Sequence, residues 1–150
     1  MTKRILVLVC ALFLFSNGAI AGGGLESFLK DLNVQARVDM DGFSARISSQ
    51  FGVPAVQVRA VIGSVREPAD AFMCFQLGQW TKQPSEQIVN TYKSNQGKGW
   101  GVLAKQMGIK PGSAEFHALK RGDLTFDGRP VSGHGDSNVK SKGRGKGHNK

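Results

Sequence analysis

The 150-residue sequence contains only two cysteines, Cys10 and Cys74. Cys10 lies in an apolar N-terminal stretch that we expect to be removed, so the remaining chain would hold one thiol and no internal disulfide. Packing of apolar side chains must then stabilise the fold. Because Cys74 lies within the apolar run at residues 72–75, we expect its thiol to be buried and unreactive.

Residues that bind metals or carry out catalysis are also scarce. Neither Cys74 nor any histidine forms a pair at metal-ligand spacing, and no glycine-rich loop has phosphate-binding spacing. The acidic residues are scattered, and several precede expected helices, where capping explains them. The sequence therefore predicts no enzyme, no cofactor and no metal site. The three histidines are His117, His134 and His148.

Long apolar runs are missing apart from residues 5–15, which are about half of the roughly 20 residues needed to span a bilayer. Two basic residues precede this run, and the small residues at 19–24 follow it. This order is typical of a signal peptide, here at 1–21, cleaved after Ala21. We therefore expect a periplasmic or secreted protein without a transmembrane segment. The alternative, a lipoprotein acylated at Cys10, is disfavoured because Val9 stands where a small residue is needed.

Acidic residues are fewer than basic ones, 11 against 20, and the net charge is +9. The tail after Val139 contributes five basic residues and no acid, whereas residues 22–139 hold 13 basic and 11 acidic residues, a net charge of +2. Within that body, residues 82–121 hold seven basic and two acidic residues, a local charge of +5. This asymmetry favours an anionic partner.

Proline and glycine divide the middle of the chain into short segments with helical spacing of apolar residues. Prolines 54, 68 and 84 suit helix starts, Ser113 suits an N-cap, and Gly122 suits a helix end. We predict an all-α fold: one small domain of six or seven short helices at residues 22–122, followed by a disordered, basic Gly/Lys-rich tail at 123–150. The expected helices span about 25–32, 41–51, 54–65, 69–80, 85–95, 99–107 and 114–121.

Residues 34–47 fit two structures. Apolar alternation from Val34 and the Asp41-Gly42 turn dipeptide indicate a β-hairpin. Phe43, Ile47 and Phe51, at i, i+4 and i+8, indicate a helix. We favour the helix because the chain downstream is helical and a lone hairpin is only marginally stable.

Residues 98–122 have the rhythm of a helix-turn-helix, with two short helices around a glycine turn. We expect this basic helical pair to contact phosphates or other anionic groups. Helix packing alone also explains its small residues and its turn, because fold does not imply function. The candidate binding residues are Lys98, Trp100, Lys105, Lys110, His117, Lys120 and Arg121.

The run GKGWGVLAKQMGIKPGSAEFHALKRG, with FGVP and PADAFM upstream and a Gly/Lys/His-rich tail, resembles a family of small secreted bacterial proteins. The resemblance covers roughly residues 39–122. It implies an exported α-helical domain and supplies no activity or functional residue.

Together these features predict an exported, non-enzymatic binding protein that contacts a polyanion through the basic helical pair and the tail. Its partner would be an anionic envelope polymer, extracellular nucleic acid or an acidic protein. Two alternatives stay open: an envelope enzyme that uses His117, and a structural or chaperone-like component with exposed apolar surface at residues 72–80.

Overall fold

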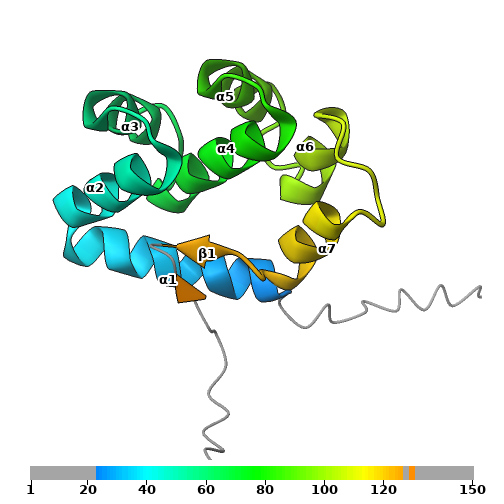
Figure 1. Cartoon of the computed structure of the whole chain (residues 1–150), viewed down its shortest axis with the longest axis horizontal. Helices are drawn as coiled ribbons and strands as arrows, with labels where there is room; N and C mark the ends of the chain where they lie inside the picture. Colours follow the sequence, from blue (N-terminus) through cyan, green and yellow to red (C-terminus); the bar gives the residue numbers. More distant parts are fainter. Residues whose placement is uncertain (1–22, 127–128, 131–150) are drawn as a thin grey trace, which may run out of the picture.

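The computed structural model describes residues 23–126 and 129–130, and within them it forms seven helices joined by short loops (Figure 1). The predicted all-α fold is confirmed. The expected signal peptide, and the tail from residue 131, lie outside the described residues. The helices are α1 (Gly24–Val38), α2 (Met40–Phe51), α3 (Ala55–Ile62), α4 (Pro68–Thr81), α5 (Ser85–Ser94), α6 (Trp100–Gln106) and α7 (Ala114–Arg121).

Helix α4 forms the centre of the fold. It contacts α1 and α2 as well as α3 and α5, and in Figure 1 it lies between α1 below and α3 and α5 above. Residues 71–78 are all buried. A helix that is apolar on every side is typical of a core position, so the other helices are arranged around α4. Among the described residues, no helix combines the length and the apolar character that crossing a bilayer requires.

Helix α1 is longer than the predicted 25–32, and the hairpin alternative at 34–47 is wrong. Phe28, Leu32 and Ala36 are buried at helical spacing along α1, and neither glycine nor proline interrupts the segment before residue 39. The dipeptide expected to form a turn lies instead in the first turn of α2. There the Asp39 side chain caps the helix by accepting a 2.8 Å hydrogen bond from the Gly42 backbone N–H.

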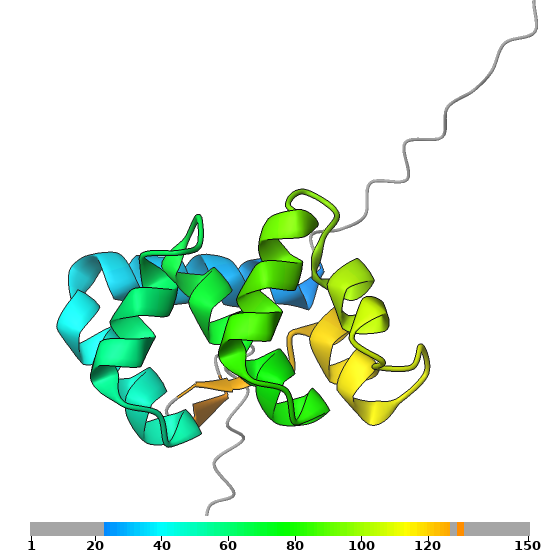
Figure 2. The same cartoon turned by 90° about the horizontal axis from the view of Figure 1, so that it is seen from above.

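Two helical hairpins, α2–α3 and α4–α5, share one type of junction. Each first helix ends at a left-handed residue, Gly52 with φ 66° or Lys82 with φ 55°. One further residue and a proline, Pro54 or Pro84, then lead into the next helix. Because the junctions match, the hairpins turn alike, and α3 and α5 contact each other on one side of α4 (Figure 2).

The first and last helices meet through glycine. Helix α7 contacts both α1 and α6, and its end at Gly122, with φ 69°, lies against the backbone of Gly24. A β-carbon on Gly24 would overlap the carbonyl group of Arg121, and one on Gly122 would overlap the backbone of Gly24. Close approach of the two backbones therefore requires glycine on both sides.

The packed body extends beyond the domain boundary expected at Gly122. Leu124 and Phe126 are buried, and the Phe126 ring lies 5.2 Å from Phe43 and 5.8 Å from Phe72 between centroids. Strand β1 (Thr125–Phe126) pairs antiparallel with β2 (Arg129–Pro130). The sequence did not predict this extension, because two apolar residues on one side of an extended segment form no helical repeat.

Candidate functional site

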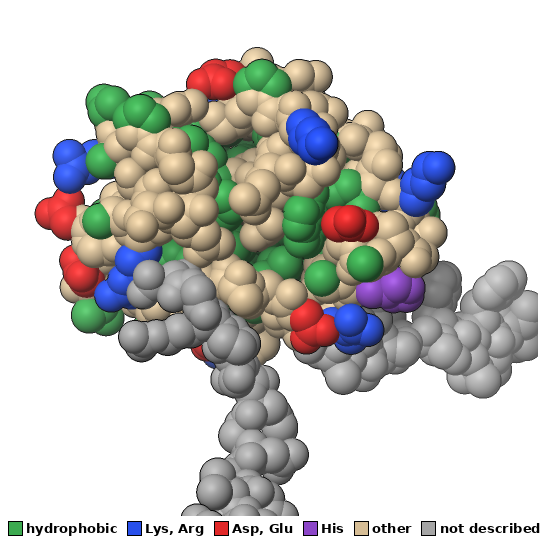
Figure 3. Space-filling model, in the orientation of Figure 1, with side chains coloured by type: hydrophobic (Ala, Val, Ile, Leu, Met, Phe, Trp, Pro, Cys, Tyr) green, Lys and Arg blue, Asp and Glu red, His purple; other side chains and the backbone are tan. Residues whose placement is uncertain are grey.

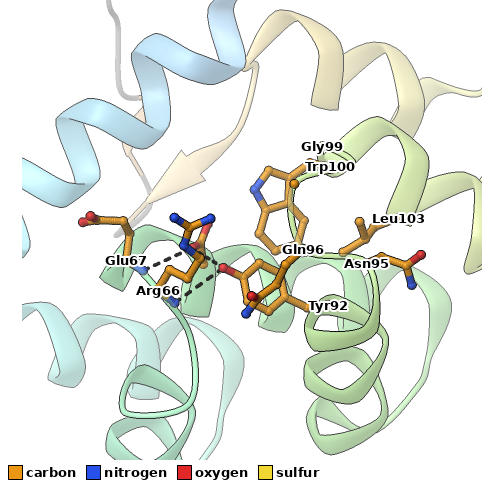
Figure 4. Close-up of a pocket in the computed structure, with 10 residues that line it drawn as sticks. Arg66, Glu67, Tyr92, Asn95, Gln96, Gly99, Trp100 and Leu103 are labelled. Atoms are coloured by element: carbon orange, nitrogen blue, oxygen red, sulfur yellow. Dashed lines mark hydrogen bonds between the residues drawn. The ribbon is translucent and has the colours of Figure 1, made fainter.

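A pocket of about 350 Å³ opens between the start of α4, the end of α5 and the loop that leads into α6 (Figure 4). Its volume is at the lower end of the range for small-molecule sites, about 300–1,000 Å³. The side chains that give the pocket its chemistry are Arg66, Asp70, Tyr92, Gln96, Trp100 and Leu103.

A buried tyrosine and a carboxylate form the polar end of this pocket. The Tyr92 hydroxyl donates a 2.7 Å hydrogen bond to Asp70 Oδ2 and accepts a 3.4 Å bond from the Arg66 backbone N–H. The Tyr92 side chain is only 7% exposed. Burial, together with the hydrogen bond and the charge of Asp70, raises the pKa of Tyr92 to about 12. The hydroxyl therefore stays protonated at neutral pH.

Asp70 has one carboxylate oxygen in use and one open. Its Oδ2 accepts both the Tyr92 hydroxyl and the backbone N–H of Glu67, the latter at 3.1 Å. Within the described part of the chain, Oδ1 takes part in no hydrogen bond, and the side chain borders the pocket. An ionised carboxylate accepts several hydrogen bonds, so a ligand donor can still bind here.

Cys74 lies one helical turn after Asp70 and faces the core. It is fully buried, as predicted, and burial with the nearby Asp70 charge raises its pKa to about 12. The thiolate, which is the reactive form of cysteine, is therefore scarce at neutral pH. The thiol contributes to packing rather than to the chemistry of the pocket.

The loop that closes the pocket is held by Asn95. Its Nδ2 donates to the carbonyl oxygen of Thr91 at 2.9 Å, and its Oδ1 accepts from Lys98 Nζ at 3.1 Å and from Gln106 Nε2 at 3.2 Å. These bonds tie the end of α5 both to the loop and to the end of α6. One amide side chain thus fixes where α6 begins.

Two glycines in that loop then set the position of Trp100. Gly97 and Gly99 have φ of 85° and 80°, a region that side chains disfavour, although a β-carbon on either would meet no atom within 4 Å. Trp100 follows as the first residue of α6 and stacks on Tyr92, with ring centroids 5.3 Å apart and planes 18° apart. The loop conformation therefore builds an aromatic wall.

The predicted binding lysines lie outside this pocket. Lys98, Lys105, Lys110 and Lys120 are exposed on the α6–α7 pair and its loops, and none has a carboxylate within ion-pair distance among the described residues. Figure 3 shows basic side chains that are separated by neutral surface on the visible face. The lysines form a dispersed surface rather than one site.

The remaining predicted site residues have three different positions. Trp100 belongs to the pocket wall, and Arg121 pairs with Asp123 at 2.6 Å between Nε and Oδ2. His117 is exposed on α7, whereas Cys74 is buried on α4. In the described part of the chain, no group of three or more His, Cys, Asp or Glu side chains could hold a metal ion.

Sequence reasoning missed Arg66, Asp70 and Tyr92 as members of one site. Tyr92 is the only tyrosine in the chain, and Asp70 follows Pro68 at a capping position, so each residue had a local explanation. Their contact joins positions 22 residues apart, and no single-sequence periodicity reports such a pair. Comparison with known proteins does not supply the function either: no family model, curated protein or solved structure gives a significant match to the chain.

Proposed function

We propose that this is an exported, non-enzymatic binding protein whose α5–α7 end contacts an anionic polymer. The observation that carries the proposal is a dispersed set of exposed lysines without carboxylate partners in the described chain, Lys93, Lys98, Lys105, Lys110 and Lys120. At the other end two arginines are paired, Arg37 with Glu67 and Arg59 with Asp41.

Unpaired surface lysines attract phosphate, sulfate or carboxylate groups, and their binding releases counterions from the polymer. Such binding weakens strongly as salt rises, because exposed charges are screened within about 10 Å at 0.1 M salt. A dispersed lysine surface favours a long, repeating polymer over a single small anion. The five basic residues after Val139 would add to the attraction.

A charge-matched pair of triple variants tests the lysine surface. The test variant is Lys105→Gln, Lys110→Gln and Lys120→Gln, and the control is Lys30→Gln, Arg37→Gln and Arg59→Gln, which removes the same charge from the other end. Binding to a fluorescent single-stranded oligonucleotide and to polygalacturonate is measured by anisotropy between about 50 and 200 mM salt.

The test variant should bind at least about tenfold more weakly at low salt, and its slope of log K against log salt should fall by about 2–3. The control should bind about as tightly as the parent, because its three residues lie outside the lysine surface. It should also stay folded, because the exposed ion pairs of Arg37 and Arg59 contribute little to stability. Equal losses in both variants, or binding that ignores salt, would contradict a specific lysine surface. Deletion of residues 137–150 separately measures the part that the tail plays.

Export is tested by the N-terminus of the protein in its native host. Cleavage after Ala21 predicts that mass spectrometry of envelope or culture fractions finds a chain that begins at Gly22. Intact Met1 on protein in the cytoplasmic fraction would contradict export.

The chaperone-like alternative expects exposed apolar surface at residues 72–80. Residues 72–78 are buried, so that surface does not support it.

A further inference from the structure

The pocket beside α4 holds two charged groups of opposite sign next to each other. The Arg66 backbone N–H and Asp70 Oδ2 both bond to the Tyr92 hydroxyl, which places these two residues at the same part of the pocket lining. The Arg66 side chain is exposed at the pocket lining, and within the described residues it forms no ion pair. A guanidinium group and a carboxylate oxygen are thus both open to one ligand.

The second carboxylate at this end is already engaged. Glu67 also lines the pocket, but its Oε2 pairs with Arg37 Nη2 at 3.3 Å, whereas Asp70 forms no ion pair among the described residues. Its negative field is strong enough to contribute to the raised pKa values of both Tyr92 and Cys74. A ligand ammonium group at Asp70 Oδ1 would add a charge-assisted hydrogen bond to an oxygen that accepts none from the described residues.

Apolar side chains also line the pocket, next to Tyr92. Trp100 is half-buried and stacks on Tyr92, and the buried Leu103 lies one turn further along α6. Together they present an aromatic and aliphatic wall beside the charged groups. An apolar ligand side chain can therefore bury surface here while its polar head stays at Arg66 and Asp70.

We propose that this pocket binds a free amino acid with an apolar side chain, with its ammonium group on Asp70 and its carboxylate on Arg66. An α-amino acid carries both charges on one carbon, which matches two adjacent protein groups of opposite sign. A neutral sugar would leave both protein charges without an ionic partner. A polyanion would be repelled by the negative charge of Asp70. This site is independent of the lysine surface, and either proposal can fail alone.

The first test uses ligands that differ by one charge. A Trp80→Phe background leaves Trp100 as the only tryptophan, because the chain has two, and its emission reports ligand in the pocket. L-leucine is titrated beside leucinamide, which lacks the carboxylate, and N-acetyl-leucine, which lacks the ammonium. Calorimetry on the parent protein confirms each affinity. Leucine should bind at least about tenfold more tightly than either analogue, because each analogue loses one hydrogen bond between charged groups.

The second test uses matched variants in the same background. Asp70→Asn retains one oxygen, which can accept from both the Tyr92 hydroxyl and the backbone N–H of residue 67. The fold should therefore persist, but leucine should lose its advantage over N-acetyl-leucine. Arg66→Gln should instead remove the advantage of leucine over leucinamide. Lys105→Gln, which lies outside the pocket, should change neither ratio. Circular dichroism verifies folding, and if Asp70→Asn fails to fold, the ligand series on the parent decides.

Several outcomes overturn the proposal. No detectable binding of leucine would contradict the site. Equal affinity for leucine and both analogues would show that the pocket does not recognise the ammonium and carboxylate groups of the ligand. Binding of glucosamine without leucine would show that an amine suffices and that Arg66 contacts no carboxylate. Loss of leucine binding in Lys105→Gln would move the site to the lysine surface.

Discussion

The two halves of this molecule differ in net charge and in the share of residues that are buried. Residues 23–81 hold five basic and six acidic residues, a net charge of −1, whereas residues 82–121 hold seven basic and two acidic residues, a net charge of +5. Nine of the 14 residues of α4 are buried, against one of the eight residues of α7. The difference indicates that the body around α4 supplies most of the packed core, whereas α6 and α7, the basic pair, carry exposed positive charge.

The largest effect on stability should come from removing a large buried side chain of α4. Phe72 is fully buried and contacts the rings of Phe28, Phe51 and Phe126. Phe72→Ala should lower the free energy of unfolding in urea by about 3–5 kcal/mol. The matched change Phe116→Ala, on the half-buried face of α7, should cost less than about 2 kcal/mol. Similar costs at both sites would remove the contrast between the two halves.

Alkaline pH should weaken the body next. The pKa of Tyr92 rises from 10.0 to about 12 and that of Cys74 from 9.0 to about 12, so the native state keeps protons that the unfolded chain releases. Stability from these groups is complete below about pH 9 and declines as the pH rises towards 12. Urea midpoints measured across this range should fall.

A double variant, Tyr92→Phe and Cys74→Ala, checks the source of that decline. Without either ionisable group, the urea midpoint should change less between pH 9 and 12. An unchanged slope would assign the alkaline sensitivity to other groups. At neutral pH the variant should be less stable than the parent, because Asp70 loses the Tyr92 hydroxyl as a hydrogen-bond donor.

A smaller effect is expected within the basic half, at the loop between α5 and α6. Asn95→Ala removes three hydrogen bonds, to Thr91, Lys98 and Gln106, and should cost about 1–2 kcal/mol. Trp100 should then gain exposure, and its emission should shift to longer wavelength. Asn90→Ala, an exposed change on the same helix, should leave both properties unchanged; a matching shift there would mean that Asn95 has no special position.

The smallest effects should come from the two left-handed junction residues. Lys82→Gly should raise stability by up to about 1 kcal/mol, because a residue with a β-carbon is strained at φ 55°. Gly52→Ala, at φ 66° with open space around it, should lower stability by about 1 kcal/mol. Lys82→Ala controls for the lost charge and should give no gain. Thermal unfolding of the three variants would reveal any departure from this order.

Local chemistry made much of the helical fold predictable, while distant contacts stayed out of reach. Ser113 does cap α7, with its side chain accepting from the Phe116 N–H at 3.2 Å, and Gly122 ends the helix as expected. The second half of α1 was missed because Val34 and Val38 are exposed, at 51% and 83%, so the apolar pattern there does not match the buried face. Tertiary packing, rather than periodicity, decides that segment.

The candidate site was also predicted only in part. The lysines were identified from composition, because net charge is a property of the sequence. The pocket was not, because it requires Asp70, Tyr92 and Trp100 to come from three different helices. Trp100 was predicted as a binding residue of the basic pair, but one face of its ring lies against Tyr92.

The glycine contact between the two ends of the helical body bears on when the chain can fold. Gly24 at the start of α1 meets Gly122 at the end of α7, and Phe126 fills space between α2 and α4. A ribosome therefore releases nearly the whole polypeptide before these long-range contacts can form, and their high sequence separation slows closure. A chain whose core depends on contacts between its first and last helices therefore completes its fold only after most of it has been synthesised.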